Sequence, residues 1–365
     1  MEKDFLKGIY ILTGTTIGVG FFSLPYILSQ VGFLRMLFYF LFLGIVVFLI
    51  HQFFGELAIL TPDFKRMPGF ARIYLGKIGE KVAFFSAIFG IYGTLLAYLI
   101  LGGNFLGNFF GIPQFFSILI YFFAGSTLVY FGTKAISKIE FLDVLLFSLI
   151  LILILIFGQK FLSLPQAATQ NPNFFLPYGP ILFSLWGASV IPEVEEILTK
   201  KKNLKRVIFF SILISAIFYF VFSALVFAIS KEKTSEDAIS GLKDFLPPPL
   251  IKLLFLFGFA TSFTSFVSLG LTLRKIFWYD FKIGKNTSFF FSCLPPLALY
   301  FLGFQKFLTT ISFVGAICLG IEGILILAMY YKKFKGKISP FKTSLILALA
   351  VFLLVGIILE FKKWL

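Results

Sequence analysis

Two stretches of small and hydroxyl-bearing residues interrupt apolar segments, and their backbone and side chains are the best candidates for binding a small ligand. The first runs from Thr13 to Gly20 and holds three glycines and three threonines, with Pro25 shortly after it. Each glycine costs a helix about 1 kcal/mol relative to alanine, and glycine tolerates non-helical backbone. We therefore predict a helix that is broken at residues 14–19.

The second stretch runs from Ser184 to Pro192 and contains Gly187. The same reasoning predicts a second break at residues 185–189. In a membrane, irregular backbone persists only where it lines a protein cavity, because lipid offers no hydrogen bonds. Two such breaks, one opening each half of a chain, are typical of inverted-repeat transporters with a substrate site near the bilayer midplane. For either segment alone, close helix packing through small residues is the alternative.

Broken helices offer unpaired backbone groups to a ligand that carries both a carboxylate and an ammonium group, such as an amino acid. Amides after a break lie at a helix N-terminus, where the helix dipole favours an anion. Carbonyl oxygens before a break accept hydrogen bonds from a cation. The amides that we assign to a carboxylate are those of Gly18, Val19 and Gly20. The carbonyls that we assign to an ammonium group lie around Thr13, Gly14, Phe183 and Ser184.

Aromatic side chains near the breaks are candidates for the pocket that holds the substrate side chain. We select Tyr92, Phe183 and Trp186. The chain has 55 phenylalanines, so lipid contact or core packing is the alternative for any single aromatic residue.

Four hydroxyls in a later apolar segment share one helix face, because they lie at positions i, i+3, i+4 and i+7. They belong to Thr261, Thr264, Ser265 and Ser268. Neutral oxygen ligands suit a sodium ion, and hydrogen bonding between helices is the alternative.

Ionisable residues inside apolar segments are functional candidates by default. Glu322 has no lysine close to it in sequence, and we treat it as a candidate proton relay. For Glu56, Asp143 and Glu193 we favour pairing with lysines near the cytoplasmic membrane surface. We interpret the single histidine, His51, as a satisfied interior residue rather than a titrating switch.

The elements that must position these residues are membrane-spanning helices. Hydrophobic residues make up 59% of the 365 residues and charged residues 13%, which excludes a water-soluble fold. A helix of roughly 20 apolar residues crosses a hydrocarbon core of about 30 Å. We predict about eleven such spans, near residues 5–29, 34–60, 82–106, 114–131, 139–157, 178–198, 204–229, 250–277, 287–303, 307–331 and 342–360.

The two breaks divide the predicted all-α membrane protein into repeats. Residues 1–160 form a first five-helix repeat, and residues 161–331 form a second repeat of inverted orientation, since each contains an odd number of crossings. Residues 332–365 form an additional eleventh span. The polar segment 231–249 reads as an external surface loop.

The net charge of +15 follows from lysines and arginines that collect in alternate loops. This is the positive-inside pattern of a membrane protein, so we expect no nucleic-acid partner. The basic residues placed on the cytoplasmic side are Lys3, Lys7, Lys134, Lys138 and the groups within 65–81, 200–206, 274–285 and 332–342. We therefore predict a protein of the plasma membrane with an uncleaved cytoplasmic N-terminus and an external C-terminus.

Three sequence motifs carry a family resemblance. The segment 14–25, GTTIGVGFFSLP, resembles the first helix of the amino acid/auxin permease family, which includes bacterial aromatic amino acid permeases. The segment 183–196 resembles the broken sixth helix of that family and the acidic stretch after it, and Gly55-Glu56-Leu57 is a weaker match. The resemblance implies a LeuT-like fold in the amino acid-polyamine-organocation superfamily and amino acid transport by alternating access. Relatives with a histidine or acidic residue in the sixth-helix break differ from this chain, which has Trp186 there.

The resemblance also implies an ion site. In sodium-coupled LeuT-like proteins, hydroxyls spaced like those of Thr261, Thr264 and Ser265 complete a sodium site with first-helix carbonyls, which correspond here to Gly14 and Ile17. Proton-coupled relatives often place a lysine from the fifth span in that cavity, where this chain has Phe147. We therefore favour Na+ over H+ as the coupling ion and expect no other cofactor.

Other functions fit the sequence less well. An intramembrane enzyme needs a nucleophile with a base or clustered metal ligands, and a channel needs filter loops or charged rings. The sequence shows neither pattern, and Cys293 and Cys318 suggest no disulfide or metal site. We predict a cation-coupled amino acid symporter that is not an enzyme. An uncoupled exchanger, or a carrier of another small amine or zwitterion, is the alternative, and the sequence does not define the oligomeric state.

Overall fold

The computed structural model describes residues 3–61, 65–132, 140–163 and 173–363, and the side chains of 140–145 and Asp280 are not described. The described chain is helical. The first half contains α1 (Lys3–Thr16), η1 (Val19–Ser23), α2 (Leu24–Val31), α3 (Phe33–Leu60), α4 (Met67–Phe110), α5 (Gln114–Phe131), α6 (Glu140–Gly158) and η3 (Gln159–Phe161). The second half contains α7 (Tyr178–Leu185), η4 (Ala188–Val190), α8 (Ile191–Ile197), η5 (Lys201–Asn203), α9 (Leu204–Ser230), η6 (Lys231–Lys233), η7 (Ser240–Leu242), α10 (Pro248–Lys275), η8 (Ile276–Asp280), α11 (Lys285–Phe301), α12 (Phe307–Phe313), η9 (Val314–Leu319), α13 (Gly320–Phe334) and α14 (Pro340–Phe361).

Both predicted interruptions are present. The first helix leaves helical geometry at Ile17 and Gly18, continues as the short 3₁₀ helix η1, and then resumes as α2. The two parts of this span are bent by 50° relative to each other. The second interruption lies at Trp186 and Gly187, between α7 and η4, and α8 follows. Both lie inside the predicted segments, because small residues and proline weaken helix propagation there.

Seven described helices are long and apolar enough to cross a membrane, and an eighth span results if the bent pair α1 to α2 is counted. The prediction of about eleven spans adds three regions: α6, α7 with α8, and α11. The part of α6 that is fully described contributes only the shorter apolar helix Leu146–Phe161, and α7, α8 and α11 have 8, 7 and 17 residues. The number eleven and the repeat boundaries at 160 and 331 therefore stay predictions.

The predicted third span is longer than expected. α4 starts at Met67 rather than near residue 82, because a short helical piece precedes a bend at Gly76. Gly76 has φ of 80°, a left-handed conformation that glycine adopts without steric cost.

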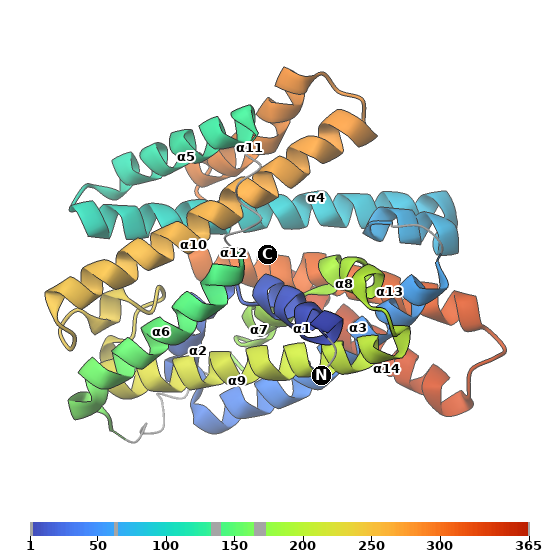
Figure 1. The fold of residues 1–365 in the computed structure, drawn as a ribbon, viewed down its shortest axis with the longest axis horizontal. Coiled ribbons are helices and arrows are strands. Elements are labelled where there is room, and N and C mark those ends of the chain that lie inside the picture. Colours follow the sequence, from blue (N-terminus) through green and yellow to red (C-terminus); the bar gives the residue numbers. More distant parts are fainter. Residues whose placement is uncertain (1–2, 62–64, 133–139, 164–172, 364–365) are drawn as a thin grey trace.

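The helices form two packed groups (Figure 1). In one group α10 lies along α4 and α5, with α11 beside them. In the other, α9 packs on α1, α2 and α3, and α13 packs on α14 and α3. α12, η9 and α13 also contact α4 and so join the two groups. The broken spans lie in the second group, where η1 packs on α7.

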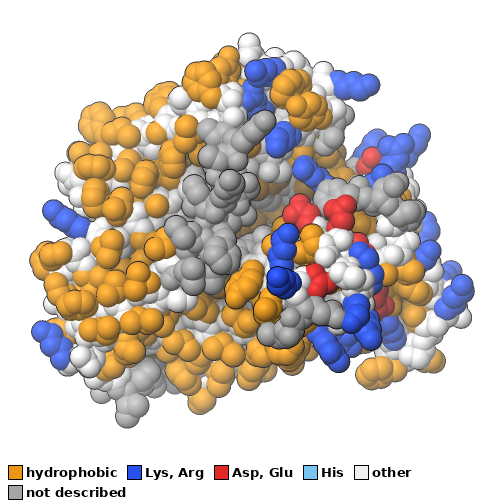
Figure 2. Space-filling model, viewed as in Figure 1, with side chains coloured by type: hydrophobic (Ala, Val, Ile, Leu, Met, Phe, Trp, Pro, Cys, Tyr) orange, Lys and Arg blue, Asp and Glu red, His pale blue; other side chains and the backbone are white. Residues whose placement is uncertain are grey.

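The charges gather at one end of this bundle. Figure 2 shows hydrophobic side chains over most of the visible face and many of the lysines and arginines at its right-hand end. The start of α4, the start of α9, the end of α10 and the turn from α13 to α14 lie at that same end (Figure 1). These elements carry the basic groups within 65–81, 200–206, 274–285 and 332–342, which we predicted to share one side of the membrane, while Lys134 and Lys138 lie outside the described residues. The clustering agrees with a single membrane topology, and it does not define which side is cytoplasmic.

Candidate functional site

The two breaks lie in direct contact. A β-carbon added to Gly20 would lie 2.5 Å from the Oγ of Ser184 and 2.9 Å from the Cδ1 of Phe183. A β-carbon on Gly187 would lie 2.8 Å from both Leu12 Cδ1 and Thr16 Oγ1. Each break therefore uses one glycine to approach the other, and residues about 170 positions apart in sequence form one site.

The first break exposes a different set of backbone groups from the one predicted. The Ile17 amide still donates to the Thr13 carbonyl at 2.8 Å, so the expectation that the Thr13 carbonyl is freed is wrong, because the helix persists to Thr16. The Gly18 amide instead donates to the hydroxyl of Tyr219 at 3.4 Å. The Gly14 carbonyl, which a continuous helix would pair with the Gly18 amide, is therefore released.

The amides assigned to a carboxylate lie at the start of η1. Within the described residues, the Val19 and Gly20 amides donate no hydrogen bond, as is usual for the first N–H groups of a helix. A β-carbon on Gly18 would have only the Thr16 carbonyl oxygen near it, at 4.0 Å. Open space therefore lies beside the first of the three amides.

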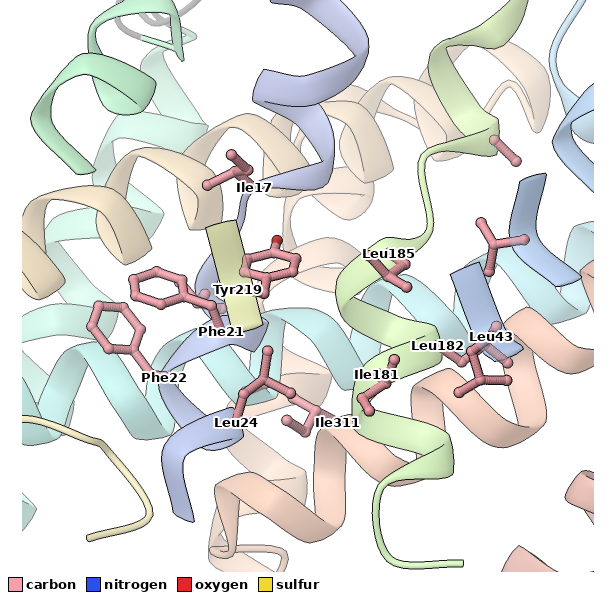
Figure 3. Close-up of a cluster of buried hydrophobic side chains, with 14 of the residues drawn as sticks. Ile17, Phe21, Phe22, Leu24, Leu43, Ile181, Leu182, Leu185, Tyr219 and Ile311 are labelled. Atoms are coloured by element: carbon pink, nitrogen blue, oxygen red, sulfur yellow. The ribbon is translucent and has the colours of Figure 1, made fainter. Parts of the chain in front are cut away.

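Tyr219 of α9 connects the two breaks. Its hydroxyl donates to the Thr16 carbonyl at 2.6 Å and lies 3.2 Å from the Ser184 carbonyl. The side chain is fully buried, and its ring lies between Phe21 of the first break and Leu185 at the end of α7 (Figure 3). Tyr219 was not among the residues predicted for the site.

A pattern in the sequence could have indicated Tyr219. This residue belongs to a series of polar residues at four-residue intervals, with Ser211, Ser215 and Ser223, in an otherwise apolar helix. All four side chains are buried, and the Ser211 hydroxyl donates to the Ile9 carbonyl of α1 at 3.4 Å. Residues spaced by four lie on one helix face, so the series marks the side of α9 that faces the first broken helix.

An apolar cavity lies beside η1. Its lining includes six phenylalanines, and the remaining lining residues are isoleucine and leucine: Phe21, Phe22, Phe147, Phe218, Phe222, Phe257, Ile150, Ile154, Ile239, Leu242 and Leu254. The cavity has room for about one water molecule. An aromatic ligand would therefore require these side chains to move apart.

The three aromatic residues predicted for the pocket have different positions. Phe183 lies at the contact between the breaks, against Gly20. Tyr92 does not reach the breaks, because its hydroxyl donates to the Phe291 carbonyl of α11 at 2.6 Å, so its assignment to the pocket is wrong. The face of α4 that packs on η9 carries Gly90 and Gly93 instead. On α4, Tyr98 is close enough to Tyr219 for an electrostatic interaction.

Trp186 turns away from the first break. Its ring meets that of His51 edge-on, with centroids 5.1 Å apart, and its Cη2 lies against Gly323 of α13. Its Nε1 is buried and has no hydrogen-bond partner among the described residues. Both His51 ring nitrogens are buried, and neither has a hydrogen-bond partner in the described part of the chain. The expectation that His51 is a satisfied interior residue is therefore wrong.

Two of the three hydroxyls proposed for sodium donate to carbonyls of their own helix. Thr261 donates to the Phe257 and Gly258 carbonyls, and Thr264 donates to the Ala260 and Thr261 carbonyls, at 3.1 to 3.2 Å. α10 reaches the first break through η1, whereas α1 packs on α9, α6 and α8. The structure therefore does not join Thr261, Thr264 and Ser265 to the carbonyls of Gly14 and Ile17 by any hydrogen bond among the described residues.

Phe147 occupies the position that the family comparison suggested. Its ring lies 4.6 Å from that of Phe21 at the first break and 4.8 Å from that of Phe257 on α10. An apolar side chain rather than a cation thus fills this point between the first break and α10.

Two of the three acidic residues predicted to pair with basic residues lie near cations. Glu56 accepts from Tyr330 at 2.5 Å and lies 3.6 Å from Lys342, which confirms the expected pairing with a lysine. Glu193 is within electrostatic reach of Arg66. The side chain of Asp143 lies outside the described residues.

Two broken helices that meet inside a bundle of apolar helices define a transporter of the LeuT-like fold. Solved structures of transporters have the same fold. MhsT in complex with L-phenylalanine is 17% identical over 97% of both chains, with a TM-score of 0.60. Mhp1, a nucleobase-cation-symport-1 family transporter with bromovinylhydantoin bound, is 13% identical over 97% of this chain and 90% of its own, with a TM-score of 0.62. The Eremococcus coleocola manganese transporter is 14% identical over 98% and 86%, with a TM-score of 0.59.

The family is defined by sequence. Residues 1–361 match the model of the tryptophan/tyrosine permease family. The chain belongs to this family and is an amino acid transporter. No curated protein matches it in sequence.

Proposed function

We propose that the protein carries aromatic L-amino acids by alternating access, with the substrate held at the two breaks. The observation that carries this proposal is the position of backbone groups without helical hydrogen-bond partners at η1, whose Phe21 and Phe22 line an apolar cavity. Tryptophan and tyrosine need both features, a polar site for the charged groups and an apolar one for the ring. Family membership supports the same substrate class, and a similar fold in MhsT binds L-phenylalanine.

The substrate carboxylate would accept hydrogen bonds from the amides of Gly18, Val19 and Gly20. The ammonium group would donate to carbonyls of both breaks, with Thr16 and Ser184 as the nearest pair because both face one point. Isolated charges cost several kcal/mol or more in a membrane interior. Backbone groups that are already free of helical hydrogen bonds offset part of this cost without adding a charge.

Cation coupling is part of the proposal, with sodium as the first candidate. The ligands would be carbonyls of Gly14 and Ile17 with hydroxyls of Thr261, Thr264 and Ser265. Two features support it: the Gly14 carbonyl lacks its helical partner, and a hydroxyl that donates to its own helix keeps oxygen lone pairs for a metal ion. Binding requires α1 and α10 to approach each other.

Proton coupling is the second candidate, and one observation favours it. The Trp186 ring contacts that of His51 and lies against Gly323, the residue after Glu322, so an ionisable carboxyl group lies near the second break. Protonation would remove a charge next to the break and change its packing.

Uptake into proteoliposomes made from the purified full chain tests these proposals. We expect saturable uptake of labelled L-tryptophan or L-tyrosine that is driven by an inward sodium gradient at constant pH and ionic strength. Thr264→Ala with Ser265→Ala should weaken the sodium dependence more than binding at saturating sodium. Uptake that follows a pH gradient without sodium and is lost in Glu322→Gln would refute the sodium assignment. Absence of uptake of every aromatic amino acid would refute the substrate class.

The proposal also covers the orientation of the chain in the membrane, its internal repeats and its family resemblance. We infer a cytoplasmic N-terminus and an external C-terminus from the end at which the basic segments gather. We also retain the two five-helix repeats and the resemblance to the amino acid/auxin permease family.

A further inference from the structure

The Tyr219 hydroxyl contacts three backbone groups that belong to the proposed substrate site. It donates to the Thr16 carbonyl at 2.6 Å, it lies 3.2 Å from the Ser184 carbonyl, and it accepts from the Gly18 amide at 3.4 Å. A hydroxyl has one proton, so it bonds fully to one carbonyl and at most shares that proton with the other.

An ammonium group serves the two carbonyls at this point better than the hydroxyl does. It has no lone pair for the Gly18 amide, which would donate to the substrate carboxylate instead. A nitrogen at the position of the Tyr219 oxygen would lie within hydrogen-bond distance of both carbonyls. Its three protons would satisfy both acceptors, and a charge-assisted hydrogen bond is roughly twice as strong as a neutral one. The hydroxyl therefore resembles the amino group of a substrate in position but is the weaker donor.

The surroundings hold Tyr219 at this point. The side chain is fully buried, and its ring is nearly parallel to that of Phe21, with centroids 6.3 Å apart and an angle of 12°. Without the hydroxyl, two buried carbonyls between the breaks would lose a donor, which costs about 1–3 kcal/mol for each unsatisfied group. The contact thus stabilises the pair of breaks when no ligand is present.

We propose that the Tyr219 hydroxyl occupies the ammonium position of the site between substrates and leaves it when an amino acid binds. This inference rests on the proposed amino acid site. Tyr219 is then a positioning residue with two effects. It keeps the carbonyls of Thr16 and Ser184 paired while the empty transporter changes conformation, and it lowers the affinity for any ligand whose ammonium group must displace it.

The test compares the wild type with Tyr219→Phe, which removes the hydroxyl and keeps the ring. Binding to the detergent-solubilised full chain is measured for L-tryptophan, for tryptamine, which lacks the carboxylate, and for indole-3-propionate, which lacks the ammonium group. Losing one competing hydrogen bond of about 1 kcal/mol should lower the Kd of L-tryptophan and tryptamine about fivefold. The Kd of indole-3-propionate should change much less, because this ligand competes with the hydroxyl only for the Gly18 amide, whose hydrogen bond of 3.4 Å is the longest of the three.

Three results would overturn the proposal. Weaker binding of the two ammonium ligands would mean that the hydroxyl is a permanent substrate ligand. An equal change for all three ligands would mean that Tyr219 acts only on the shape of the site. Unchanged binding of all three would mean that the hydroxyl does not compete.

A matched control is Tyr121→Phe, which removes another fully buried hydroxyl, on α5 against Phe263 and Phe266 of α10. It should leave all three Kd values unchanged. The melting temperature without ligand gives a readout that does not depend on the substrate. Tyr219→Phe should have a lower melting temperature than both the wild type and Tyr121→Phe. Equal melting temperatures would refute the bridge, that is, the link that the Tyr219 hydroxyl makes between the two breaks. If the wild type binds none of the probes, the proposed substrate class fails, while the melting comparison still decides whether the bridge exists.

Discussion

Gly18 and Gly20 lie two residues apart in the first break, and the structure predicts opposite consequences for a methyl group at each. On Gly20 the methyl would lie 2.5 Å from Ser184 Oγ and 2.9 Å from Phe183 Cδ1, well inside the 3.5–4.0 Å of an optimal contact between carbon atoms. Overpacking of this kind costs about 1–3 kcal/mol. Gly20→Ala should therefore lower the melting temperature by several degrees, because it pushes the two breaks apart.

On Gly18 the nearest atom to the methyl would be the Thr16 carbonyl oxygen at 4.0 Å. The backbone has φ of −126° and ψ of −171°, which any residue adopts. Gly18→Ala should leave stability within about 0.5 kcal/mol of the wild type. Its methyl would point into the open space beside the amide assigned to the carboxylate. Loss of one hydrogen bond to a charged group, about 1.5 kcal/mol, should weaken substrate binding about tenfold.

Melting curves and equilibrium binding of L-tryptophan, measured on the same detergent-purified samples, separate these two effects. Ser184→Ala in the Gly20→Ala background should recover part of the lost stability, since it removes the atom nearest to the new methyl group. Wild-type melting of Gly20→Ala would refute the contact between the breaks. Wild-type affinity of Gly18→Ala would remove the Gly18 amide from the substrate site.

Three further predictions follow from individual contacts. Asp4 accepts from the Thr199 amide at 2.8 Å, and this hydrogen bond lowers the pKa of Asp4 below its ordinary value of 3.8. Its stabilising effect is present above that value and is lost as the pH falls through the lower folded value, so Asp4→Ala should melt below the wild type at pH 7, and this difference should shrink as the pH falls below 3.8. Tyr92→Phe should leave substrate affinity unchanged in the same binding assay, because the hydroxyl bonds to the Phe291 carbonyl, and a large loss would return Tyr92 to the pocket. Gly187→Ala should lower the melting temperature as Gly20→Ala does, because its methyl would overlap side chains at the end of α1, and an unchanged melting temperature would contradict that packing.

Local composition was enough to predict the interruptions of both broken spans. Glycine, threonine and proline within apolar segments weaken a helix wherever they occur, so the sequence predicted breaks at 14–19 and 185–189, and the structure has them at 17–18 and 186–187. The transporter class follows from the same feature, because lipid cannot satisfy a broken backbone. Hydropathy likewise predicted the long spans, since each depends on about 20 neighbouring residues.

Only the tertiary structure decided which groups meet at the breaks. Tyr219 bonds to a carbonyl 203 positions away, and no local pattern contains that pairing, although its series of buried hydroxyls marked the helix face. Tyr92 was misplaced because a helix residue's partner depends on how the helix is rotated against its neighbours, and α4 turns this side chain toward α11. The Thr13 carbonyl was misassigned because one more turn of α1 forms than its glycine content suggests. The sequence by itself determined where the backbone must break, which is a local property, and packing between distant helices determined what fills the break.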